Sequence, residues 1–119
     1  MELRRLSGRK VCERVKTKGM LWKGKHVQAR IMRGQPRTVA QDTPPALYVG
    51  VVTSAKLDKS AVRRNRMRRR CREALRLEVS ESPKAVSAQL ILLPRSSSLT
   101  APFGELLMDA RRLLSSLSA

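Results

Sequence analysis

The stretch that decides the fold spans residues 61–73 and reads AVRRNRMRRRCRE. It opens a run without Gly or Pro that extends to about residue 79, and good helix formers dominate this run. The run therefore predicts a helix whose apolar and polar side chains separate onto opposite sides. The apolar side holds Met67, Cys71, Ala74 and Leu75, and the polar side holds Asn65, Arg69, Arg72 and Arg76, flanked by Arg66 and Arg68.

Such a helix can bury one side and present guanidinium groups on the other. Arginine suits phosphate because its planar donors reach two oxygens at once and because it is more weakly hydrated than lysine. A solvated cationic helix is the simpler interpretation of a charge run. However, nine basic residues and a single acid between Lys56 and Arg72 are too dense and too one-sided for it. We therefore expect this helix to bind nucleic acid.

The whole chain has the charge of a nucleic-acid-binding protein. Its 119 residues include 26 Lys+Arg and 9 Asp+Glu, which gives a formal net charge of +17. A polyanionic partner would relieve the self-repulsion of such a chain. The length predicts one domain spanning residues 1–119.

Other features predict a cytoplasmic protein without a membrane partner. The longest apolar run, residues 90–93, has the length of a strand rather than a membrane-spanning helix. The first residues lack the apolar core of a signal peptide. Cys12 and Cys71 lie far apart and lack metal-ligand spacing, so we expect free thiols in a reducing compartment.

Periodicity predicts the order of the remaining elements. Helices are expected at residues 7–18 and 101–117, and strands at residues 25–32, 47–54 and 88–93, with a further short strand at Met20–Lys23. A turn is expected around Pro83. The resulting order, α-β-β-β-α-β-α, predicts an α+β sandwich with a small central sheet. Basic residues are concentrated before residue 80, so the binding face should lie in the first two-thirds of the chain.

Catalytic groups are scarce. Hydrolysis of a phosphodiester by a protein typically needs clustered carboxylates that hold metal ions, or an acid–base pair. His26 is the single histidine, and we expect it to be structural or a surface residue. Glu73 and Glu78 lie within the basic helix, where ion pairing is the better interpretation. We therefore expect no catalytic residue and no metal ligand in this chain.

Residues 61–73 resemble the Arg-Asn-Arg motif of the bacterial ribonuclease P protein family. In that motif an alanine and two variable residues precede Arg-Asn-Arg, and an apolar residue, two or three basic residues and Arg-Glu follow it. Residues 50–56, GVVTSAK, resemble the family's strand that ends in Ser-Lys-Lys. The first helix, the last strand and the last helix also match, so the resemblance covers nearly the whole chain.

The resemblance implies a fold and a function. The fold would be an α/β sandwich with a left-handed β-α-β crossover, an exception to the usual handedness, similar to a domain of a small-subunit ribosomal protein. The chain would bind the catalytic RNA of ribonuclease P and precursor tRNA. The RNA subunit would perform the Mg2+-dependent removal of the 5′ leader, with Mg2+ held mainly by RNA and with no protein partner required. The implied RNA contacts are Lys56, Lys59, Arg64, Asn65, Arg66, Arg68, Arg69, Arg70 and Arg72.

The family's central cleft, between the first helix and the sheet, holds the leader. By position this implies leader contacts from Cys12, Lys16, Gln28 and Arg30. The family usually has phenylalanines where this chain has Cys12 and Lys16, and often an aromatic residue where it has Arg30. A cleft of this composition should bind the leader more by charge than by stacking. Ala55, where lysine is frequent, is a further departure.

Two other classes of protein remain open. A ribosomal or other structural RNA-binding protein would share the charge and size. A DNA-binding protein with a recognition helix is disfavoured, because no helix-turn-helix spacing precedes the arginine-rich helix. The aromatic residues do not decide among these classes: Phe103 is expected in the core, Tyr48 in the core or on the surface, and Trp22 either against a base or at the core edge.

Overall fold

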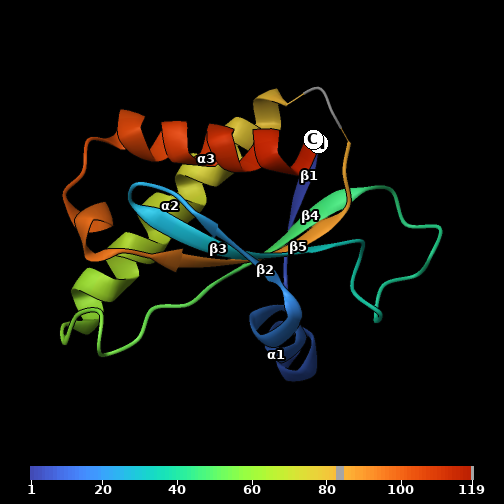
Figure 1. The fold of residues 1–119 in the computed structure, drawn as a ribbon, viewed down its shortest axis with the longest axis horizontal. Coiled ribbons are helices and arrows are strands. Elements are labelled where there is room, and N and C mark those ends of the chain that lie inside the picture. Colours follow the sequence, from blue (N-terminus) through green and yellow to red (C-terminus); the bar gives the residue numbers. More distant parts are fainter. Residues whose placement is uncertain (83–84, 119) are drawn as a thin grey trace.

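The computed structural model describes residues 1–82 and 85–118 (Figure 1). The elements are β1 (Glu2–Arg5), α1 (Arg9–Lys18), β2 (Met20–Lys23), β3 (Val27–Arg33), β4 (Ala46–Val51), α2 (Ala61–Glu81), β5 (Ala88–Pro94), the 3-10 helix η1 (Ser96–Leu99) and α3 (Phe103–Ser118). The predicted order is confirmed from α1 onward, with ends shifted by a few residues. The turn predicted around Pro83 lies outside the described residues.

Strand β1 is the element that the sequence did not predict. It is a four-residue edge strand that runs parallel to β4, with Leu3 opposite Leu47. Its sequence, ELRR, has one apolar side chain and no strand-like alternation. Its extended form is therefore set by pairing with a distant strand rather than by local preference.

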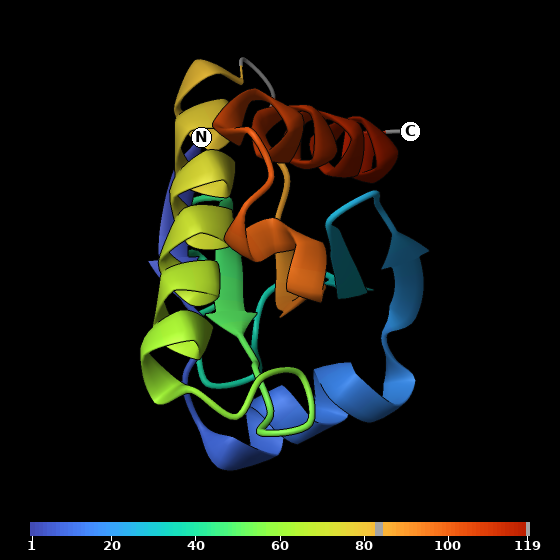
Figure 2. The same cartoon turned by 90° about the vertical axis from the view of Figure 1, so that its left-hand side faces the viewer.

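The five strands form one mixed sheet in the order β1-β4-β5-β3-β2. β1, β4 and β5 are parallel, and β3 pairs antiparallel with both β5 and β2. β4 and β5 are neighbours joined through α2. Viewed from the α2 side with both strands pointing upward, β5 lies to the left of β4, so this crossover is left-handed, as the family resemblance implied (Figure 1 and Figure 2).

Helices cover both faces of the sheet. α2 and α3 lie on one face and α1 on the other (Figure 1). Because successive strand residues point to opposite faces, the sheet supplies two cores. The main core, beneath α2 and α3, includes Ala29, Leu47, Val49, Leu90 and Leu92. The smaller core, beneath α1, consists of Leu6, Val15, Ala46, Tyr48 and Ile91.

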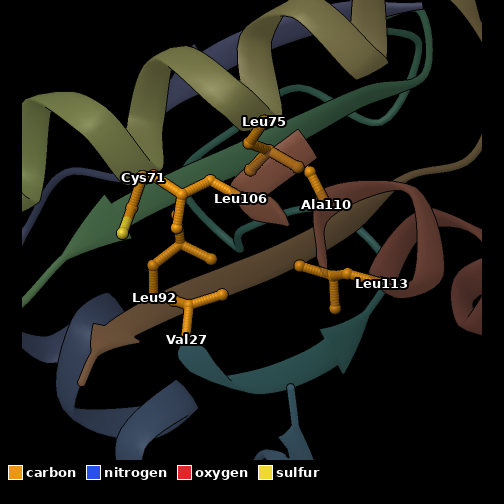
Figure 3. A pocket seen from close by; sticks show the side chains of 7 residues that line it. All are labelled: Val27, Cys71, Leu75, Leu92, Leu106, Ala110 and Leu113. Atoms are coloured by element: carbon orange, nitrogen blue, oxygen red, sulfur yellow. The ribbon is translucent and has the colours of Figure 1, made fainter. Parts of the chain in front are cut away.

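The contact between α2 and α3 is a closely packed apolar seam, shown in Figure 3. The remaining gap measures about 10 Å3, which leaves room for no more than a water molecule. Its lining consists of Val27, Cys71, Leu75, Leu92, Leu106, Ala110 and Leu113. Burial raises the pKa of the Cys71 thiol to about 11, so this thiol stays protonated at neutral pH. The apolar side predicted for the helix is confirmed, because Met67, Cys71, Ala74 and Leu75 are all buried.

The aromatic residues belong to these cores. Tyr48 is buried in the smaller core, and Phe103, as predicted, packs against the main core. Trp22 is half-buried and also packs against the main core. Of the two interpretations of Trp22, the structure favours a cover for the core edge.

Asp109 of α3 holds the turn between β2 and β3. Its carboxylate is buried and accepts hydrogen bonds from the backbone N–H groups of Lys25, His26 and Val27, at 3.0, 2.7 and 3.2 Å. Three donors satisfy a charge that would otherwise be costly to bury. The turn is thereby fixed to α3.

His26 adds a second contact between the β2–β3 turn and α3, and its role is structural. We call this set of contacts the junction. The buried ring of His26 lies 2.8 Å from the hydroxyl of Ser97, through Nδ1, and 2.7 Å from Oε1 of Glu105, through Nε2. Lys25 approaches the same carboxylate oxygen at 2.9 Å. The hydrogen bonds from His26 and Lys25 hold the pKa of Glu105 below its usual value. The junction joins the β2–β3 turn, η1 and α3.

The depressed pKa of Glu105 makes the free energy of unfolding depend on pH. A carboxylate whose folded-state pKa is depressed contributes stability above its unfolded pKa, and this contribution is lost as the pH falls through the folded pKa. We expect Glu105→Gln to lower the urea midpoint at neutral pH and to flatten its decline below pH 4.5, the ordinary value for this group. Unfolding curves across the acid range measure both effects. Glu81→Gln, an exposed change on α2, is the matched control, and equal behaviour of the two variants would contradict the prediction.

Candidate nucleic-acid interface

The loop before α2 fixes where the arginine-rich helix begins. Ser60 is its N-cap: the hydroxyl accepts from the backbone N–H of Arg63 at 3.3 Å. Asp58 in turn accepts from the backbone N–H of Ser60 at 2.8 Å. The guanidinium of Arg64 folds back onto the backbone carbonyls of Asp58, at 2.7 Å, and Lys59, at 3.2 Å. Arg64, the first residue of the Arg-Asn-Arg motif, therefore helps to fix the N-terminal end of the helix.

The exposed side of α2 carries what we call the arginine stripe. Its members are Asn65, Arg66, Arg69 and Arg72, all of which are exposed, as the helical spacing predicted. Arg68 flanks the stripe, is half-buried and donates to the side-chain oxygen of Asn65. Arg76, the next residue along, donates to Glu73 at 2.9 Å. Exposed ion pairs of this kind contribute little to stability, but this one engages Arg76 within the helix.

Arg70 points in a different direction. Its guanidinium donates to the backbone carbonyls of Ser98, at 2.6 Å, and Leu99, at 2.9 Å, and also to that of Ala101. It thereby satisfies the carbonyls at the end of η1, where no helical partner is available. The sequence counted Arg70 among the RNA contacts. Its position three residues after buried Met67, at the border of the apolar side, was the one available signal for an internal role.

A cleft of about 500 Å3 lies between α1, α2 and the sheet. It brings together two sets of residues that the sequence predicted separately: Cys12 and Lys16 from α1, and Arg68, Arg69 and Arg72 from α2. None of the residues that line it is acidic. The complete lining is Arg5, Leu6, Cys12, Lys16, Val49, Gly50, Val51, Val52, Arg68, Arg69, Arg72 and Ile91. It combines an aliphatic floor with a cationic rim.

The other two predicted leader contacts are not among the residues that line this cleft. Gln28 and Arg30 are on β3 and are not part of the cleft lining. Arg30 pairs in register with Ile91 and donates to the carbonyl of Gly19 at 3.3 Å. Arg5 lines the cleft although the sequence did not indicate it, because its position depends on the unpredicted strand β1.

The edge of the interface is more open. Lys56 and Lys59 are exposed in the loop between β4 and α2. A shallow hollow of about 370 Å3 on α2 is lined by Asn65, Arg68, Arg69 and Val62. Val62 is 76% exposed at this hollow. It would be covered if a partner docked on this side of α2.

Residues 1–82 and 85–118 contain neither a metal-binding cluster nor a membrane span. This part of the chain contains no group of three or more His, Cys, Asp or Glu residues that could hold a metal ion. None of its helices is both long enough and apolar enough to span a bilayer.

Sequence comparison identifies the relatives of this chain. The family model described as Ribonuclease P matches residues 2–118. The ribonuclease P protein component of Rickettsia canadensis is 30% identical over 96 residues, which cover 80% of each chain. That of Thermus oshimai is 40% identical over 87 residues, which cover 73% of this chain and 54% of the relative.

Solved structures share the fold. The RNase P protein of Staphylococcus aureus matches with a TM-score of 0.68 and 17% identity, covering 94% of this chain and 93% of that one. The RNase P protein of Thermotoga maritima matches with a TM-score of 0.67 and 20% identity, covering 95% and 94%. The motif on α2, the family model and the fold agree: the chain belongs to the ribonuclease P protein family, the protein component of a ribonucleoprotein endoribonuclease of tRNA processing.

Proposed function

We propose that this chain binds the RNA subunit of ribonuclease P through the arginine stripe and the 5′ leader of precursor tRNA through the cleft. The observation that carries the proposal is the meeting of α1 and α2 in one cleft whose lining includes five basic and no acidic residues. A leader in this cleft would lie beside the helix that contacts the catalytic RNA. The protein would thereby position the substrate next to the site of cleavage.

The stripe has the donors that phosphates require. Arg66, Arg69 and Arg72 are exposed, whereas neighbouring arginines are engaged with carbonyls or with Glu73. Neutralising phosphates releases counterions, so about six such contacts would give a slope near −4 to −5 for log affinity against log salt. Lys56, Lys59 and half-buried Arg64 would extend this surface toward the helix start.

The cleft suits a single strand held by charge. Lys16 and the α2 arginines can reach phosphates along the rim, while Leu6 and Ile91 offer an aliphatic floor to a base. RNA-binding clefts often stack bases on aromatic rings, but no aromatic residue lines this one. Leader binding should therefore depend strongly on salt and weakly on base identity.

The cleavage chemistry is assigned to the RNA subunit. The buried acid Asp109 is engaged with three backbone N–H groups, and His26 is held between Ser97 and Glu105. Neither is placed to activate a water molecule. Mg2+ would be held mainly by the RNA and the substrate, because the cleft offers cations where a metal needs oxygen ligands. The protein's contribution would be to neutralise phosphates, in the cytoplasm and without a further protein partner.

Reconstitution tests the function. At low Mg2+ we expect the chain to stimulate 5′ cleavage of precursor tRNA by a cognate bacterial ribonuclease P RNA, because its cations replace part of the metal's screening of phosphates. The RNA without protein is the control. A ribosomal or DNA-binding protein would not stimulate the reaction, and absence of stimulation with the cognate RNA would contradict the proposal.

Variants of the adjacent residues Arg69 and Arg70 test whether RNA binding and folding depend on different arginines. We expect Arg69→Ala to leave unfolding free energy within about 0.5 kcal/mol of the wild type. The same change should weaken affinity for the RNA subunit and reduce the salt slope by about 0.7 to 0.9. Arg70→Ala carries the same charge change but should cost roughly 1–3 kcal/mol of stability, because buried carbonyls lose their donor. Urea unfolding and RNA titrations over a range of salt measure both effects. Similar profiles for the two variants would show that the arginines are equivalent.

The rate at which Cys12 is alkylated measures whether RNA occupies the cleft. Cys12 is half-exposed in the lining, whereas Cys71 is buried with a pKa of about 11, so an alkylating reagent should modify Cys12 selectively. Added to the holoenzyme, precursor tRNA with a leader should slow this reaction, and mature tRNA should not. Cys12→Ser identifies the modified site. Equal rates with both RNAs would exclude the leader from the cleft.

A further inference from the structure

A second basic groove lies on the other flank of α1. It measures about 360 Å3 and is bounded by α1, the end of β3 and the loop that follows β3. Its lining includes Lys10, Val11, Arg14, Met32, Arg33 and Arg37. No acidic residue is among those that line it. Neither the arginine motif nor the leader-cleft positions include any of these side chains.

The position of this groove follows from the geometry of α1. Cys12 and Lys16, one turn apart, face the first cleft, and Lys10 and Arg14, also one turn apart, face the second groove. Val15 lies between the two pairs and is fully buried against the sheet. α1 is therefore a ridge with a basic hollow on each side.

Arg14 is the residue that points to a ligand. Its Nε is buried and has no hydrogen-bond partner within the described part of the chain. A buried N–H without an acceptor is unfavourable, so such a group in a native protein calls for an explanation. Because Arg14 lines the groove, a ligand bound there would meet its guanidinium, and a rotation of the side chain would bring Nε to an acceptor. Arg33, in contrast, already donates to the carbonyl of Leu117 at 2.8 Å.

The side chains that line the groove indicate which class of ligand it would bind. Lys10 and Arg37 are exposed cations at the rim, suited to phosphate oxygens. Val11 and Met32 are half-buried and offer an apolar surface for a base or ribose. Because bases are accessible to such a surface in single strands rather than in duplexes, we infer that the second groove binds a nucleotide of single-stranded RNA, with Arg14 as a phosphate donor. The inference rests on the proposed function, which supplies two sources: the distal part of the leader, or an unpaired segment of the RNA subunit.

Variants of the groove test the inference in the holoenzyme. The groove variant combines Lys10→Ala and Arg37→Ala. Its matched control combines Arg95→Ala and Arg112→Ala, exposed residues that line neither hollow and give the same change in net charge. Arg14→Lys keeps the charge but removes the Nε donor. Two affinities are measured for each: that of the protein for the RNA subunit without substrate, and that of the holoenzyme for precursor tRNAs with leaders of increasing length.

We expect the groove variant to bind about tenfold more weakly than the control, the effect of losing a charge-assisted hydrogen bond, with Arg14→Lys changing in the same direction. A loss restricted to long leaders identifies the leader as the ligand. A loss of affinity for the RNA subunit identifies that RNA instead. If groove variants match the control in both measurements while the wild type stimulates cleavage, the inference is wrong and the proposed function stands. If the wild type itself fails to stimulate cleavage, the proposed function fails, and the inference with it.

Discussion

The buried seam beneath α2 is the interaction on which the rest of the structure depends. The helix carries eight arginines, whose mutual repulsion opposes its formation in isolation. Met67, Cys71, Leu75 and Val79 offset this repulsion by packing against the sheet and α3. Because this side is fixed inward, the stripe must face outward and Arg68, Arg69 and Arg72 must form one wall of the cleft. Packing thus determines the direction of the charges.

The opposite wall depends on a much smaller core. α1 is held to the sheet through Val15, which packs with Leu6, Tyr48 and Ile91, and both of its flanks are basic. Like charges on α1 and α2 face each other across the cleft, and this repulsion weakens the compact state. A polyanion between them would convert repulsion into attraction. An RNA that binds only the folded chain would also stabilise it by mass action, and folding would then be coupled to assembly.

Sequence periodicity predicted the features of the fold that depend on neighbouring residues along the chain. The two sides of α2 and most strands followed from periodicity, because each buried residue there repeats at a helical or strand spacing. β1, the neighbours of Arg70 and the cleft position of Arg5 could not be predicted, because each depends on contact with a segment distant in sequence. Gln28 and Arg30 were placed in the cleft by resemblance, yet the lining does not include them. The crossover's handedness came from the resemblance as well, since general rules favour the opposite hand.

Chemically identical side chains acquire different roles from the acceptors around them. Arg64 and Arg70 meet backbone carbonyls, and Arg76 meets Glu73, so some of the donors of each are engaged before any partner arrives. Within residues 1–82 and 85–118, neither Arg69 nor Arg72 donates to such an acceptor, and both line the cleft. Under the proposed function the motif is therefore part scaffold and part binding surface. Its density would then have a structural reason, because some arginines hold the helix start and η1 in the positions from which others would reach RNA. A count of positive charges would overestimate the phosphates that this helix can bind.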